Sequence, residues 1–417
     1  MSQFPLPCPL FDNLDQLSDP FKLKHFEAAL PASTSIRPQD ANLDYEYAWK
    51  FMWSYNGSVA TFNAYRREVE RLLQWAWLIR QEAVLKLKRE DIEQFIRFCQ
   101  KPHSRWIATK HHSRFKSKNG QRIANLDWRP FVVTGSKSAH RQGHVLDVKN
   151  YLASKSSVQA TFSILSSFYG YLMQEGICEL NPVSLIRQKS KFLIKQQQQA
   201  PVRRISNLQW DYVIETIEQL ANQQPERFER SLFIMNALYA MYLRVSELVW
   251  DKRSQPVMGD FRKDQDGNWW FHVLGKGNKD RIITVSNAML KALKRYRKFL
   301  GLSPLPSPDD ATPLVSKQLG HGAICSTRQI RIIVQEAFDL AYQRMQNDGL
   351  EEDAGDLLSA TVHWLRHTGI SEDVKIRPRE HVRDDAGHSS MQTTDRYIES
   401  DLRERHASAK HKPIKET

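Results

Sequence analysis

The chain has 417 residues, of which 41% are hydrophobic and 26% charged, so it can form two or three domains with substantial cores. Its 60 Lys and Arg outnumber its 47 Asp and Glu, and the net charge of +13 points to a polyanionic partner, either nucleic acid or a membrane surface. These numbers exclude a single small module and a disordered polymer.

Residues 1–44 contain six prolines and little periodicity, which predicts an extended N-terminal arm with room for one short helix. From residue 45 the apolar pattern becomes helical. Ser58 and Asp91 are each predicted to cap a helix, and a third helix is predicted at 158–174. These helices indicate a small all-helical domain at 45–185.

A polar stretch at 101–145 interrupts that domain. It contains ten Lys and Arg and one acidic residue, Asp127, which gives a local charge of +9. Trp106, Phe115 and Trp128 lie among these charges, where they could stack on bases or wedge between them. We interpret the insertion as a DNA contact, and a solvated surface loop is the alternative. The contacting residues are expected to be Arg114, Lys116, Lys118 and Arg122.

A segment of low complexity at 186–204 has no acidic residue and is predicted to be a basic interdomain linker. Its DNA contacts are expected from Lys189, Lys191 and Lys195. A second domain is predicted at 205–405, followed by a tail at 406–417. Its pattern predicts helices at 207–222, 227–243, 287–300, 327–347 and after 361, with two strands at 269–274 and 282–285. The expected fold class is mainly α with a small β-sheet.

Cysteine spacing and hydropathy indicate which cofactors and which cellular compartment to expect. The four cysteines form no CxxC pair and the histidines of the insertion fit no tetrahedral spacing, so we expect no metal and no disulfide scaffold. The longest largely apolar run, 231–243, is shorter than the roughly twenty residues of a membrane span. No signal peptide is recognised at the N-terminus. We therefore expect a cytoplasmic protein without a membrane partner.

Four short segments of the second domain carry groups suited to phosphoryl chemistry. They are LRVSEL at 243–248, GKGNK at 275–279, HWLRH at 363–367 and GHSS at 387–390, with Tyr397 nine residues after His388. Each alone is weak, because a single arginine at a helix end is usually a cap or an ion pair. The glycines around Lys276 do not indicate a nucleotide-binding loop, since Gly277 stands where that motif has Ser or Thr.

Taken together, in this order and at these separations, the segments resemble the tyrosine recombinase (phage integrase) family. The resemblance implies a helical core-binding domain and a mixed α/β catalytic domain. It also implies strand cleavage through a 3′-phosphotyrosyl bond without a cofactor, and assembly of a tetramer on paired sites in double-stranded DNA. The catalytic residues that it implies are Arg244, Lys276, His363, Arg366, His388 and Tyr397.

The chemistry explains why these residue types are needed. A phenol has an ordinary pKa of about 10, so Tyr397 needs a base, for which His363 is our first candidate. Arg244 and Arg366 have planar forks that pair with non-bridging phosphoryl oxygens. Lys276 would protonate the leaving 5′ oxygen, and His388 would bind a phosphoryl oxygen.

The sequence departs from the family pattern just before Gly387. Asp385 and Ala386 stand where the family often has two leucines, and the preceding stretch is heavily charged, so the packing of the segment carrying His388 is left open. Three alternatives also stay open: a type IB topoisomerase, an inactive DNA-binding accessory protein and a recombinase that resolves chromosome dimers. We favour an enzyme that integrates or excises a mobile element.

Overall fold

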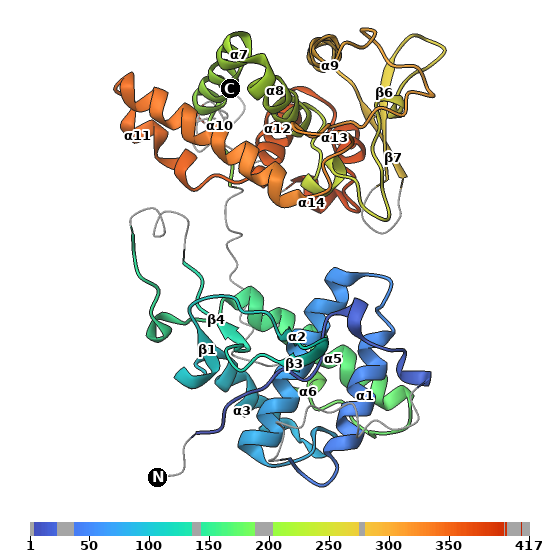
Figure 1. Ribbon diagram of the computed structural model, residues 1–417, viewed down its shortest axis with the longest axis vertical. Helices are drawn as coiled ribbons and strands as arrows, with labels where there is room; N and C mark the ends of the chain where they lie inside the picture. Colours follow the sequence, from blue (N-terminus) through green and yellow to red (C-terminus); the bar gives the residue numbers. More distant parts are fainter. Residues whose placement is uncertain are drawn as a thin grey trace, which may run out of the picture. The chain divides into compact units, whose positions relative to one another are not determined.

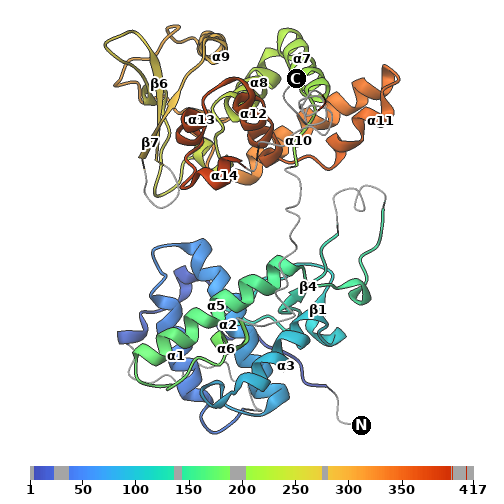
Figure 2. The same cartoon turned by 180° about the vertical axis from the view of Figure 1, so that it is seen from behind.

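The computed structural model describes residues 4–22, 37–135, 143–187, 203–274, 280–395, 397 and 410. The chain divides into two compact units, Met1–Gln197 and Gln198–Thr417, and each has its own hydrophobic core (Figure 1, Figure 2). Both units are mainly helical with small sheets, which confirms the predicted fold class. Among the described residues, no helix is both long enough and apolar enough to cross a membrane.

The N-terminal unit is a bundle whose helices begin where the sequence supplies caps. Ser58 accepts the Thr61 N–H at 3.4 Å and starts the helix that buries one apolar face. The predicted Asp91 cap is wrong by one turn, because Asp91 lies inside its helix and accepts the Lys88 N–H at 2.9 Å. The helices are α1 (Ala41–Trp53), α2 (Val59–Trp75), α3 (Arg89–Gln100), α5 (Lys155–Gln174) and α6 (Ser184–Arg187).

Residues 4–22 are extended, as expected of an arm, except for two 3-10 turns at Leu14–Gln16 and Pro20–Lys22, and they pack on the helical domain. Phe11 is fully buried and stacks on Tyr45, with ring centroids 4.7 Å apart. The Gln74 side chain accepts the backbone N–H of Cys8 at 2.9 Å. The first helix begins at Ala41, four residues before the predicted boundary. This segment is therefore part of the domain's core.

The insertion forms two small strand pairs rather than an irregular loop. Strand β1 (Ile107–Ala108) runs parallel to β4 (Phe131–Val132), and this pairing joins the two ends of the segment that lies between them. Between them, β2 (Phe115–Lys118) and β3 (Gln121–Ala124) form an antiparallel hairpin. Asn119 and Gly120 both have positive φ in its turn, as two-residue hairpin turns require.

The C-terminal unit has a helical core with a three-stranded antiparallel sheet at one side, where β6 and β7 are labelled (Figure 1). The strand order of this sheet is β5, β6, β7. The two predicted strands are confirmed, and β5 was not predicted. The strands are β5 (Phe261–Lys263), β6 (Trp269–Leu274) and β7 (Asp280–Thr284). The longer helices are α7 (Asn207–Gln223), α8 (Pro225–Ala240), α9 (Asn287–Phe299), α10 (Thr327–Asn347) and α12 (Val362–Ile376). Three shorter ones are α11 (Glu351–Ala354), α13 (Arg379–Ala386) and α14 (Met391–Asp395).

Helix α12 lies unusually close to the end of α8. A Cβ atom on Gly369 would come within 2.2 Å of the Tyr239 carbonyl oxygen, so only glycine fits at this position. The close approach places the side chains of α12 beside the chain that follows α8. That juxtaposition builds the site described next.

Candidate active site

Arg244 lies at the start of a 3-10 turn, Val245–Leu248, that follows α8. Its backbone N–H donates to Glu247 at 2.7 Å, and its Nη1 donates to the same carboxylate at 3.0 Å. Its Nη2 donates to the Gly387 carbonyl at 3.3 Å. The turn therefore fixes one edge of the guanidinium, while 28% of the side chain stays exposed.

Arg281, on β7, shares the Glu247 carboxylate with Arg244. It makes two bonds of 2.8 Å to Glu247, and its Nε donates to the Asp385 carbonyl at 3.1 Å. Burial raises the pKa of Glu247, but the bonds and charges of Arg281 and Arg244 outweigh burial and hold it below its ordinary value. One buried carboxylate thus orders two arginines and leaves a net positive charge.

Arg366, on α12, is 4% exposed and is held by backbone carbonyls. It donates to the carbonyls of Tyr242 and Ala386, the latter at 2.5 Å, and its Nη2 lies 3.3 Å from His388 Nε2. Carbonyl acceptors satisfy the guanidinium N–H groups without neutralising the charge. Burial, followed by the charges of Arg244 and Arg281, lowers the pKa of Arg366 to about 10, so it stays cationic at neutral pH.

Tyr242 presents one of these carbonyls from a strained backbone. Its φ of 49° lies in the left-handed region, which costs a residue with a Cβ about 1–2 kcal/mol. The side chain is nevertheless 1% exposed and packs against α12, where a Cβ on Gly369 would lie 3.2 Å from its ring. The surrounding contacts must therefore outweigh the strain.

His388 follows α13 through Gly387, whose φ of 63° ends the helix. Its Nδ1 lies 2.9 Å from the Thr394 hydroxyl. Burial, followed by the charges of Arg366 and Arg244, lowers the pKa of His388 to about 4. The imidazole is therefore neutral at pH 7 and offers one donor and one acceptor nitrogen.

Tyr397 lies between two imidazoles and is 7% exposed. Its hydroxyl is 2.6 Å from His367 Nδ1, and its ring stacks on His388 with centroids 5.7 Å apart and an interplanar angle of 12°. The phenol ring also belongs to a small apolar cluster with Tyr242 and Val382. The nucleophile predicted from the sequence is thus packed among the predicted phosphate-binding groups.

His363 and His367 lie one turn apart on α12, with ring centroids 5.2 Å apart. Burial, followed by the charges of Arg366 and Arg244, lowers the pKa of His363 below its ordinary value. The sequence analysis proposed His363 as the base, whereas the structure places His367 at hydrogen-bond distance from the Tyr397 hydroxyl. The four-residue spacing within HWLRH already put both rings on one helix face, so the signal was available.

Five of the six predicted catalytic residues are therefore brought together in one unit. The sixth, Lys276, lies outside the described residues, as do Lys189, Lys191 and Lys195 of the linker. Sequence reasoning missed Glu247, Arg281 and His367. Glu247 and His367 stood inside the quoted segments, but nothing in the sequence paired Arg281 with either.

Known proteins resemble this chain across both units, although no family model matches it. The tyrosine recombinase XerC of Thermodesulfovibrio yellowstonii is 29% identical over 258 residues, which cover 60% of this chain and 73% of that protein. The tyrosine recombinase XerD of Rickettsia prowazekii is 30% identical over 158 residues, covering 37% and 48%. Both relatives are tyrosine recombinases, the family that the motifs of this sequence resemble.

The fold of this chain is also found in a solved structure. The XerH site-specific recombinase, in a post-cleavage complex with a palindromic difH substrate, aligns with a TM-score of 0.53 at 15% sequence identity. The alignment covers 95% of this chain and 92% of XerH. At that identity the likeness concerns the fold.

The N-terminal unit contains an open hollow of about 670 Å³ between α2, the insertion and the start of α5. Among its described lining residues, Glu68 is the one carboxylate, and it is buried against Thr161 at 3.0 Å. Ser154 caps α5 at the rim, and a helix N-terminus favours anions. The cationic lining consists of Arg66, Arg67, Arg71, Arg114 and Arg129. The hollow therefore carries excess positive charge.

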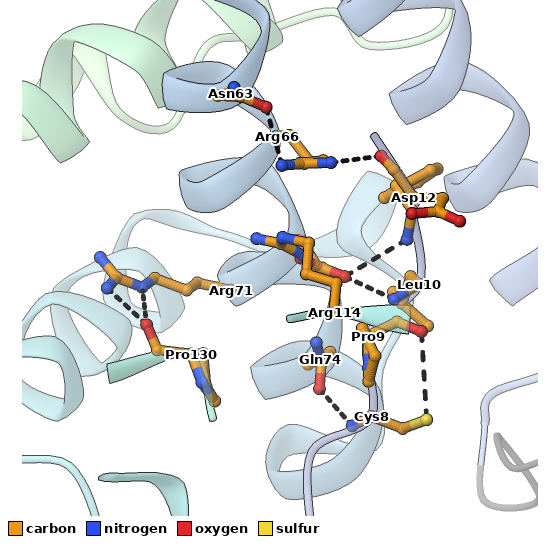
Figure 3. A network of polar contacts seen from close by, with 12 residues as sticks. Cys8, Pro9, Leu10, Asp12, Asn63, Arg66, Arg71, Gln74, Arg114 and Pro130 are labelled. Carbon is orange, nitrogen blue, oxygen red and sulfur yellow. Dashed lines mark hydrogen bonds and ion pairs between the residues drawn. The ribbon is translucent and has the colours of Figure 1, made fainter. Parts of the chain in front are cut away.

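Figure 3 shows how the N-terminal segment is tied into this region. Glu70, on α2, accepts the backbone N–H of Leu10 and also pairs with Arg114. Arg66 donates to the Asp12 carbonyl, and burial followed by the charge of Arg114 lowers the pKa of Arg66 to about 10. Arg114 of the insertion and Arg66 of α2 thus help to hold the N-terminal segment in place.

The four predicted DNA-contacting residues of the insertion have different surroundings. Arg114 is 13% exposed beside Glu70, and Arg122 makes two bonds of 2.7 Å to the Asp12 carboxylate. Lys116 and Lys118 are exposed on β2, where Lys116 also pairs with Asp127 at 2.8 Å. DNA contact by these residues stays a prediction.

The predicted role of the insertion's tryptophans as exposed stacking groups is wrong. Trp106 is fully buried and donates its Nε1–H to the Pro5 carbonyl at 2.9 Å, and Trp128 is 6% exposed under the Arg114 guanidinium. Indole rings bury a large apolar area and place their N–H on a carbonyl, so they stabilise the insertion's base. Phe115 is half-buried.

Proposed function

We propose that this chain is a site-specific DNA recombinase that cuts and rejoins DNA through a 3′-phosphotyrosyl bond to Tyr397. The observation that carries the proposal is the position of the Tyr397 hydroxyl, bonded to an imidazole in the cluster that holds Arg244 and Arg366. A phosphodiester beside these groups would meet a nucleophile and two guanidinium forks. Both forks are ordered before DNA arrives, by Glu247 and by backbone carbonyls.

In the first step, the Tyr397 oxygen attacks the scissile phosphorus and the bond from phosphorus to the 5′ oxygen breaks. The phenolic proton passes to His367, 2.6 Å away, when that imidazole is neutral. Arg244 and Arg366 bind the non-bridging oxygens as negative charge develops there. The 5′ oxygen takes up a proton and leaves as a hydroxyl, and the family resemblance gives this proton to Lys276.

In the second step, a 5′ hydroxyl attacks the phosphotyrosine, so the energy of the phosphodiester is conserved and no cofactor is needed. His388 is neutral at pH 7, and the family resemblance gives it the binding of a phosphoryl oxygen. By the same resemblance, the enzyme acts as a tetramer that exchanges strands between two duplexes.

DNA binding is assigned in part to the hollow of the N-terminal unit. Its five arginines exceed its one carboxylate, and the N-terminus of α5 adds backbone N–H donors at the rim. The exposed Lys116 and Lys118 lie on the same insertion and extend the cationic surface. DNA bound there would release counterions, so its affinity should fall steeply with salt.

This assignment is tested by changing Lys116 and Lys118 to Ala, since Arg114 and Arg122 also hold the domain together. Each lost phosphate contact should reduce the log–log salt slope by roughly 0.9. The control removes the same charge from the C-terminal unit by changing the exposed Lys291 and Lys294 of α9 to Ala. Parallel salt plots for the insertion variant and the wild type would reject the contact.

The biological role that we propose is integration or excision of a mobile element. The insertion and the charged segment before Gly387 favour it over chromosome-dimer resolution. Sequencing the DNA around the gene tests this role, because an integrated element should be flanked by direct repeats. A gene without such repeats would favour dimer resolution.

The activity itself is tested on DNA fragments that tile the region around the gene. Wild-type protein should form a covalent adduct with a fragment containing the site, seen on a denaturing gel. A topoisomerase would instead relax any supercoiled plasmid, and an accessory protein would bind without an adduct. Either result would overturn the proposed reaction.

A further inference from the structure

Arg377, at the end of α12, joins two segments that are distant in sequence. Its Nη1 donates to the Tyr242 hydroxyl at 3.0 Å and to the Asp373 carboxylate at 3.0 Å. The Tyr242 hydroxyl in turn donates to Asp373. The other nitrogen, Nη2, donates to the Asp385 carboxylate at 2.6 Å. One guanidinium therefore connects the chain after α8 with α13.

Asp385 extends this connection to the sheet. It is 4% exposed, and its Oδ1 accepts both the N–H and the hydroxyl of Thr284, at 3.0 Å and 3.2 Å. Its backbone carbonyl accepts from Arg281, which also holds Glu247. Asp385, which stands where the family pattern has a leucine, thus has hydrogen-bond donors on both carboxylate oxygens, from Thr284 on Oδ1 and from Arg377 on Oδ2.

Both ends of the connection meet at Arg366. The two carbonyls that accept from Arg366 belong to Tyr242 and to Ala386, the residue after Asp385. Arg377 therefore sets the spacing of the two acceptors that aim the Arg366 guanidinium. The network also gives a reason for a tyrosine in a left-handed conformation, because glycine would supply the backbone angle but not the hydroxyl.

We propose that Tyr242, Asp373, Arg377 and Asp385 form a positioning network that sets the orientation of Arg366 and of the segment Gly387–His388. These four residues act through Arg366 and His388 and do not react with DNA. The inference rests on the proposed function for its kinetic test, but a second measurement tests it on the free protein.

The kinetic test is Tyr242→Phe, which removes one hydroxyl and no charge. The control is Tyr212→Phe, because the Tyr212 hydroxyl also donates to a carboxylate, that of Asp348, at 3.0 Å. The charges that act on Tyr212 are those of Asp348, Arg344 and Glu215, which are not part of the site. At saturating DNA, Tyr242→Phe should slow adduct formation at least tenfold and change the dissociation constant for DNA less than twofold. Tyr212→Phe should leave both unchanged. A Tyr242→Phe rate within twofold of wild type would overturn the inference.

Arg377→Ala gives a stronger version of the same test. It should slow adduct formation more than Tyr242→Phe, and added guanidinium ion should restore part of the rate while equal ammonium does not. A loss that guanidinium leaves unchanged, in protein with a wild-type melting temperature, would count against positioning. If Arg377→Ala fails to fold, Tyr242→Phe decides.

The DNA-free test is an NMR titration of His388. The charges that lower its pKa are those of Arg366, Arg244, His367 and Arg281. If the network aims Arg366, loosening it in Tyr242→Phe should move the His388 titration upward from about pH 4, whereas Tyr212→Phe should not. An unmoved titration in both variants would overturn the inference, even if the wild type forms no adduct with any DNA tried.

Discussion

Two sets of arginines are held differently, Arg114 and Arg122 in the N-terminal unit and Arg244 and Arg366 in the C-terminal unit. Around the hollow of the N-terminal unit, Arg114 pairs with the buried Glu70, and Arg122 with Asp12. In the C-terminal unit, Arg366 is held by backbone carbonyls, and Arg244 shares a single carboxylate with Arg281. Both arrangements fix the side chain, but only a carboxylate cancels its charge.

The acceptor group therefore separates two roles. An arginine paired with its own carboxylate stabilises the fold, whereas one held by backbone carbonyls keeps a positive charge that can act on a ligand. The neighbouring histidines respond to this positive charge. Burial is the largest cause that lowers the pKa values of His363 and His388, and the charges of Arg366 and Arg244 come next. Basic composition alone does not distinguish the two cases.

The largest effect should come from removing the group that the C-terminal arginines serve. Tyr397→Phe should abolish the covalent adduct because the nucleophile is lost, and DNA affinity should change less than about twofold. A denaturing gel and a binding titration on the same DNA check both parts. An adduct that survives in this variant would assign the nucleophile to another residue.

Arg366→Lys should cost about a hundredfold to a thousandfold in the rate of adduct formation. Lysine keeps the charge but cannot reach the carbonyls of Tyr242 and Ala386 while also facing a phosphate. Arg114→Lys is the matched control, since it is the same substitution beside a carboxylate, and single-turnover kinetics should show a rate within twofold of wild type. Equal losses in the two variants would remove the contrast between the units.

His367→Gln should slow adduct formation by about a hundredfold, because the group bonded to the Tyr397 hydroxyl can no longer take its proton. His363→Gln should cost less. Single-turnover rates of the two variants on the same DNA check this order. A larger loss in His363→Gln would return the role of base to His363.

Arg114→Ala should lower the free energy of unfolding by about 3 kcal/mol, because the Glu70 carboxylate, 1% exposed, would lose its charged partner. Denaturant titration monitored by tryptophan fluorescence measures the loss. The adduct rate per folded molecule should stay near wild type. A stable variant with a slow reaction would place Arg114 in DNA binding rather than in the core.

The smallest effect concerns acid stability. The pKa of His388 is about 4 in the folded protein and about 6.5 unfolded, so the unfolded chain binds more protons between these values. Stability should therefore fall as pH drops from about 6.5 to about 4. His388→Gln should flatten that part of the profile in thermal melts. A wild-type profile that is flat over this range would show that the field at His388 is weak.

The sequence predicted the regular helices and strands better than it predicted the insertion. Caps such as Ser58 and strand 269–274 were readable because local side-chain chemistry determines them. The proposed catalytic residues came from the family resemblance, which rests on four short motifs in a fixed order. The partners of Arg114 and Arg122 were not readable, since they lie 44 and 110 residues away and nothing local specifies such pairs.

The docked N-terminal segment has a consequence for the order in which the chain folds. Its Asp12 carboxylate binds Arg122, which the ribosome adds 110 residues later, so the segment cannot complete its contacts until most of the unit has been made. Closing so long a loop costs entropy before any contact repays it. The last step in folding the N-terminal unit should therefore be the return of its first residues.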